Sequence, residues 1–133
     1  MPQPDECPPR EKVLRGITHH HIKHGKVSSS AFSGTNISVN RLAILSFDKS
    51  VAILKRNLSD PERPLSKVGR IGVGQIVELG RAYSHPDGRS DPRHLKVVPV
   101  PELDNPAHAE IRGDKISRGL ARNILAVVEL RDV

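Results

Sequence analysis

The sequence has one cysteine, few aromatic residues and no long hydrophobic run, and each shortage excludes a class of protein. Cys7 is the single cysteine among 133 residues, so the chain can form neither an internal disulfide framework nor a thiolate metal cage. A reducing, cytoplasmic compartment fits this composition best. No apolar stretch approaches the ~18 residues of a membrane-spanning helix, and no charged-then-apolar signal opens the chain. We therefore expect a soluble, cytoplasmic protein without a membrane partner.

Aromatic side chains are scarce enough to restrict both the core and the ligand. They make up 2% of the residues, and hydrophobic residues as a whole make up 36%. The core must therefore be aliphatic and thin, because globular chains average ~45–50% apolar residues. Scarce aromatics also disfavour base-specific reading of single strands, which depends on stacking.

The chain carries an excess of positive charge. Lys and Arg number 21 against 15 Asp and Glu, a formal net charge of +6. Such a balance favours polyanionic partners, because binding to phosphates releases counterions. We expect nucleic acid to be the partner, contacted from two stretches of the chain. The predicted contact residues are Lys23, Lys26, Lys115, Arg118 and Arg122.

Hydrophobic periodicity predicts a single α+β domain over residues 11–133, preceded by a flexible proline-rich tail over residues 1–10. We expect a short mixed or antiparallel sheet of four or five strands, with an amphipathic C-terminal helix packed on one face. The tail would be ordered by a partner protein, if at all. The predicted strands are residues 12–17, 26–32, 37–45, 95–100 and 107–112; the predicted helices are 18–24, 47–58, 73–79 and 114–130; residues 84–93 are a long polar loop.

Residues 13–32 concentrate groups that can exchange protons. They hold His19, His20, His21 and His24, and an imidazole with a pKa near ~6.5 can act as acid and base at neutral pH. We name His21, His24, His108 and Glu110 as candidate catalytic residues. A helix would also place His20 and His24 on one face, but no third ligand follows nearby, so no metal or cofactor is expected.

A further pattern concerns the order of residue types along the chain. Arg15, the serine triplet (Ser28, Ser29 and Ser30) and Glu110 occur in an order that is similar to the arginine, serine and glutamate succession of ADP-ribosyltransferase folds. In those folds the glutamate orients a ribose hydroxyl. The chain is short for that fold, aromatic residues to stack on nicotinamide are few, and the motif flanks differ, so no family is assigned on this order.

Three functions remain open from the sequence. The first is a small, basic accessory module that binds the phosphate backbone of nucleic acid with little base specificity. The second is a small metal-independent enzyme that acts on nucleic acid or a nucleotide with histidine acid and base residues. The third is an interaction subunit of a larger assembly.

Overall fold

Six short strands form one antiparallel sheet in the computed structural model, which describes residues 5–133. The sheet order is β6-β7-β4-β1-β5-β8, and every pairing is antiparallel. The predicted α+β class with an antiparallel sheet is therefore confirmed. The strands are β1 (Lys12–Ile17), β4 (Ile37–Arg41), β5 (Lys67–Gly72), β6 (Leu95–Pro99), β7 (His108–Gly113) and β8 (Glu129–Asp132).

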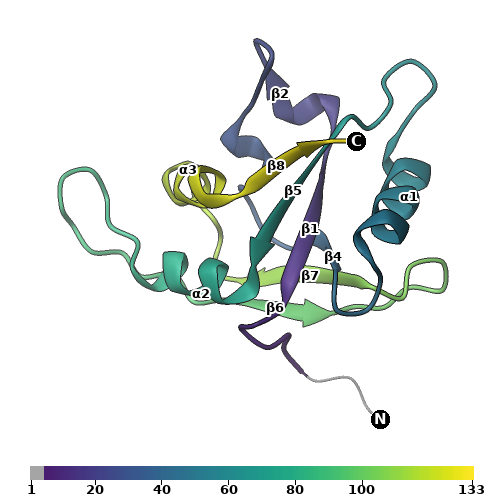
Figure 1. Ribbon diagram of the computed structural model, residues 1–133. Coiled ribbons are helices and arrows are strands. Elements are labelled where there is room, and N and C mark those ends of the chain that lie inside the picture. Colours follow the sequence, from purple (N-terminus) through teal and green to yellow (C-terminus); the bar gives the residue numbers. More distant parts are fainter. Residues whose placement is uncertain (1–4) are drawn as a thin grey trace.

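The sheet opens in its middle, between β1 and β4. Strand β1 pairs with β4 only through Val13 and Leu14, whereas it pairs with β5 along all of its length. On its other side, β4 pairs with β7 from Ile37 to Asn40. Figure 1 shows the resulting geometry, in which β1 and β5 run steeply across the direction of β6 and β7. The residues of β1 after Leu14 therefore face a gap in the hydrogen-bonded sheet.

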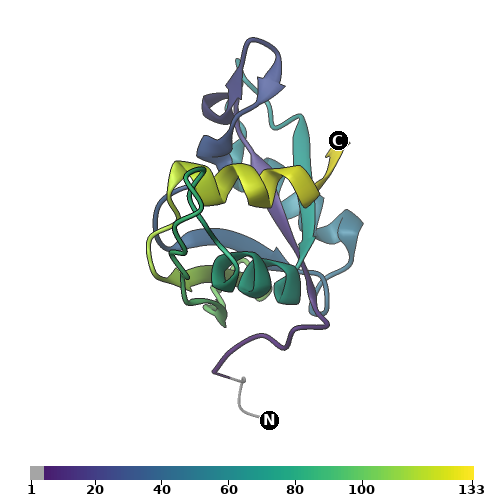
Figure 2. The same ribbon diagram turned by 90° about the vertical axis from the view of Figure 1, so that its left-hand side faces the viewer.

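Three α-helices cover the two faces of the sheet. Helix α1 (Phe47–Leu58) matches the predicted range, because Ser46 caps it by accepting a hydrogen bond from the Lys49 amide. It buries Leu54 in a small core on one face. Helices α2 (Val73–Arg81) and α3 (Arg118–Val127) bury side chains in a second, larger hydrophobic core on the other face. Figure 2 shows these two helices side by side.

The C-terminal helix is shorter than the predicted range of 114–130. It starts only after the Ser117 cap and ends at Val127, and the following residues form β8 instead. Pairing of β8 with β5 satisfies backbone groups that a longer helix would have left at an open sheet edge. Neither β8 nor β5 was among the predicted strands. Leu120, Ala121 and Ile124 of α3 are buried in the larger core.

The histidine-rich segment folds differently from its predicted helix over residues 18–24. Only a 3₁₀ turn, η1 (His19–His21), forms, and it is followed by a hairpin of β2 (Ile22–Lys23) and β3 (Lys26–Val27). His24 and Gly25 make the hairpin turn with φ of 52° and 77°, as two-residue turns require. The predicted strand over 26–32 shortens to β3, and a second 3₁₀ turn, η2 (Ser29–Ala31), follows it.

The predicted proline-rich tail includes residues 1–4, which lie outside the described residues, and residues 5–10, which contact the sheet. The Cys7 amide donates to the Val97 carbonyl at 2.7 Å, and the Cys7 side chain is buried in the larger core. The Pro9 carbonyl accepts from the Gly74 amide at the start of α2. Residues 5–10 are thus held by contacts within their own chain.

No helix within residues 5–133 has the length and apolar character to cross a membrane.

Candidate functional site

Arg15 occupies the gap between β1 and β4. Its Nε donates to the Ala31 carbonyl and one terminal nitrogen donates to the Ser38 carbonyl, both at 2.9 Å. Burial lowers the pKa of Arg15 to about 10. No carboxylate within residues 5–133 forms an ion pair with this guanidinium. A largely desolvated cation without a counter-charge is unfavourable, so the position is suited to an anionic ligand.

The gap continues into a cavity of about 280 Å³, called here the Arg15 cavity. That volume is close to the lower end of the range of small-molecule sites, ~300–1,000 Å³. Its wall combines apolar groups with amides, a hydroxyl, an imidazole and the carboxylate of Glu102, which can fix the orientation of a ligand. The lining residues are Arg15, Gly16, Ser38, Val39, Asn40, Leu54, Asn57, Leu58, Glu102, Asn105 and His108.

His108 and Ser38 form a hydrogen-bonded pair at the wall of the cavity. His108 Nδ1 lies 2.8 Å from the Val100 carbonyl, which can only accept, so Nδ1 carries the proton. His108 Nε2 then accepts from the Ser38 hydroxyl at 3.2 Å. A hydroxyl bonded to an imidazole, itself oriented by a third group, is the arrangement that activates a nucleophile or moves a proton.

Glu110 lies beside this pair because of the strand register. It is directly opposite Ser38 in the pairing of β4 with β7, and two residues from His108 on the same face. Its carboxylate accepts from Arg112 Nε at 2.9 Å, which orients it. In the same strand pairing Asn40 lies opposite His108. The Asn40 side chain is fixed by reciprocal amide hydrogen bonds with Asn105.

The other two candidate histidines lie elsewhere. His21 Nδ1 accepts from the Thr18 amide at 3.2 Å, and burial, Arg15 and the two preceding histidines lower the pKa of His21 to about 4. Its ring is therefore neutral at pH 7 and closes the η1 turn. His24 is exposed in the hairpin turn. The Arg15 cavity is lined by His108 but by neither His21 nor His24.

His20 and His24 do not share a helical face, because they lie on a turn and a hairpin rather than on one helix. Within residues 5–133 no three or more His, Cys, Asp or Glu side chains gather in a way that could hold a metal ion.

The predicted phosphate-contacting residues meet on another surface. Two adjoining hollows share Ser33 and Arg118 and together form what is called here the cationic groove. One hollow is lined by Lys23, Ser28, Ser29, Ser30, Ser33, Arg118 and Arg122; the other by Ser33, Gly34, Arg93, Lys115, Ile116, Ser117 and Arg118. Lys26 lies directly opposite Lys23 in the hairpin, so both lysines share one face. The two predicted contact stretches are thus brought together.

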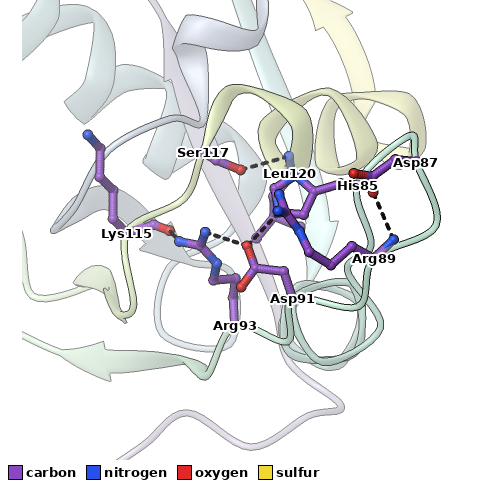
Figure 3. Close-up of polar contacts among 8 residues, drawn as sticks. All are labelled: His85, Asp87, Arg89, Asp91, Arg93, Lys115, Ser117 and Leu120. Atoms are coloured by element: carbon purple, nitrogen blue, oxygen red, sulfur yellow. Dashed lines mark hydrogen bonds and ion pairs between the residues drawn. The ribbon is translucent and has the colours of Figure 1, made fainter.

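The polar loop over residues 84–93 reaches the far end of this groove. Asp91 accepts from His85 at 2.8 Å and from Arg93 at 2.7 Å, and Arg93 also donates to the Lys115 carbonyl at 2.9 Å. Figure 3 shows these contacts beside the Ser117 cap of α3. The hydrogen bonds from Arg93 and then His85 hold the pKa of Asp91 below its usual value. The loop is therefore tied to the start of α3.

Sequence reasoning missed Arg15 and Ser38 as members of a cavity with His108. Neither lies in a local motif, and the residues meet only because β4 pairs with β7 and parts from β1. Comparison of the chain with known protein families, curated proteins and solved structures finds no match.

Proposed function

We propose that the chain is an enzyme that acts on a nucleotide in the Arg15 cavity. The observation that carries this proposal is the Arg15 guanidinium, which faces the cavity with two carbonyl partners and no carboxylate among residues 5–133. A phosphate or another anionic part of a nucleotide would supply the missing counter-charge. The asparagine amides, the Ser38 hydroxyl and the His108 imidazole on the wall would orient the remainder.

The order of residue types narrows the substrate. Arg15 donates to Ala31, which directly follows the serine triplet, and to Ser38, which pairs with Glu110. Arg15 thus bonds to the backbone beside the triplet and at Ser38, whereas Glu110 adjoins Ser38 through strand pairing. The serine on the cavity wall is Ser38 rather than a member of the triplet. This arrangement supports NAD⁺ as the nucleotide, with ADP-ribose as the transferred group.

The proposed reaction breaks the bond between nicotinamide nitrogen and ribose, and its electron pair leaves with nicotinamide. Glu110, which lies opposite Ser38 but is not among the lining residues of the cavity, accepts a hydrogen bond from a ribose hydroxyl and stabilises the positive charge that develops on the sugar. An acceptor hydroxyl or water then bonds to the ribose carbon. His108 Nε2, the unprotonated ring nitrogen, takes the proton of that acceptor. These proposed steps use side chains alone.

The test is release of nicotinamide from NAD⁺ by the purified chain, with and without EDTA, followed by chromatography. Glu110→Gln is expected to lower the rate by about 100-fold, and His108→Ala by a similar factor. Glu129→Gln is the matched control, because Glu129 also pairs with an arginine but lies on β8, at the far edge of the sheet. Absence of nicotinamide release, or equal loss in Glu110→Gln and Glu129→Gln, would overturn the proposal.

A further inference from the structure

We propose that the cationic groove binds the sugar–phosphate backbone of nucleic acid. This inference goes beyond the proposed enzyme, because the groove shares no lining residue with the Arg15 cavity. The two hollows adjoin through Ser33 and Arg118, with volumes of about 380 and 520 Å³. They form an extended, open surface rather than an enclosed pocket, which suits a linear ligand better than a compact one.

Four cations of the groove have no carboxylate partner within residues 5–133, whereas a fifth, Arg93, pairs with Asp91. Lys23, Lys115, Arg118 and Arg122 are exposed, and none forms an ion pair within residues 5–133. Elsewhere, exposed or half-exposed cations have carboxylate partners, as in the pairs Lys67–Asp132, Arg70–Glu129, Arg81–Glu78 and Arg112–Glu110. Neither hollow is lined by Asp or Glu. Four cations without a carboxylate partner in the described residues are thus gathered on one concave surface.

Neutral donors accompany these cations. The serine triplet and Ser33 line the hollow between Lys23 and Arg122, and hydroxyls are frequent phosphate ligands in nucleic-acid complexes. Arg118 and Arg122 are one helical turn apart and face the same hollow, so they can contact successive groups along a strand. No aromatic residue lines either hollow, so recognition through base stacking is not available there. The groove is thus suited to the backbone of nucleic acid without base preference.

Fluorescence anisotropy with a labelled 20-base-pair duplex, measured between 50 and 200 mM salt, tests this inference. Four phosphate contacts predict that log affinity falls with log salt at a slope of about −3.6, roughly a 150-fold loss over that range. The double variant Arg118→Gln/Arg122→Gln should reduce the slope to about −1.8. The matched control Lys67→Gln/Arg70→Gln removes the same charge from cations that already have carboxylate partners, and should leave the slope unchanged.

Three results would overturn the inference. They are an affinity that does not depend on salt, an equal loss in the two double variants, and competition by inorganic phosphate at the concentration at which the unlabelled duplex competes. Nicotinamide release by the Arg118→Gln/Arg122→Gln variant separates this inference from the proposed enzyme. That activity should be retained on free NAD⁺, since neither residue lines the Arg15 cavity.

Discussion

Replacement of His21 by asparagine should remove a defined part of the pH dependence of stability. The pKa of His21 is lowered from 6.5 to about 4 by burial, by Arg15 and by the neighbouring histidines. In the unfolded chain the ring takes a proton near pH 6.5, so between pH 6.5 and 4 the unfolded state binds more protons than the folded state. Stability contributed by neutral His21 is therefore complete above pH 6.5 and is lost as the pH falls toward 4.

The size of this effect follows from the difference between the two pKa values. Each tenfold change in proton affinity corresponds to ~1.36 kcal/mol. The difference between the two pKa values therefore sets an upper bound of about 3.4 kcal/mol on what neutral His21 contributes to the free energy of unfolding. Because the ring is only partly shielded from water, screening reduces the expected contribution to about 1–2 kcal/mol. The free energy of unfolding should thus decrease between pH 7 and 4 both in the natural chain and in a variant without this ring. The decrease should be about 1–2 kcal/mol larger in the natural chain.

Urea unfolding monitored by circular dichroism at pH 7, 6, 5 and 4 measures the effect. In His21→Asn the side-chain oxygen can still accept from the Thr18 amide, as Nδ1 does now, but it does not titrate in this range. His20→Asn is the matched control, since His20 is the exposed neighbour in the same turn. The reasoning is refuted if the two variants lose stability equally between pH 7 and 4.

Three further changes probe the fold itself. Glu11→Gln leaves a buried arginine on β4 without its carboxylate and should cost about 3 kcal/mol in urea unfolding, whereas Glu129→Gln, in an exposed pair, should cost less than about 1 kcal/mol. Gly113→Ala combines a φ of 113° with a collision against a neighbouring backbone carbonyl, so it should lower the unfolding midpoint more than Gly88→Ala, which has a φ of 88° in open space. Burial raises the pKa of the Cys7 thiol, so iodoacetamide should modify it slowly in the native protein and rapidly in urea; rapid native labelling would contradict the buried position.

Local signals in the sequence were sufficient for elements whose ends are set by nearby residues. Helix α1 was predicted over its full length because a serine cap precedes a regular apolar spacing at Val51, Leu54 and Leu58. Strand β6 also forms within the predicted range, and Pro99 at its end is compatible with the edge position of β6, since proline has no amide to donate to a neighbouring strand.

The errors in the predicted elements arose where a sequence pattern is compatible with two local structures. A histidine followed by glycine is compatible with a helix end and with a two-residue hairpin turn, because both need positive φ. The structure has the hairpin, with His24 and Gly25 at its turn. The apolar spacing of residues 114–130 continued past Val127, but the chain there joins the sheet as β8, an outcome that depends on the exposed edge of β5.

The candidate sites depend on contacts between distant parts of the chain. Ser38 and His108 are 70 residues apart, and Lys23 and Arg118 meet only when the hairpin packs near α3. The sequence named His108, Glu110 and the groove cations as candidates by residue type, and they stay predictions. It could not identify Ser38 or the position of Arg15, since both follow from strand register and from the opening between β1 and β4.

The most direct test of the Arg15 cavity is an NMR titration of the labelled protein with ADP-ribose, followed through the Arg15 Nε–H resonance. The account predicts a saturable shift of this resonance together with the backbone amides of Ser38 and His108, and loss of that shift in Arg15→Lys. Unchanged Arg15, Ser38 and His108 signals at saturating ADP-ribose, or shifts confined to Lys23, Arg118 and their neighbours in the cationic groove, would contradict it.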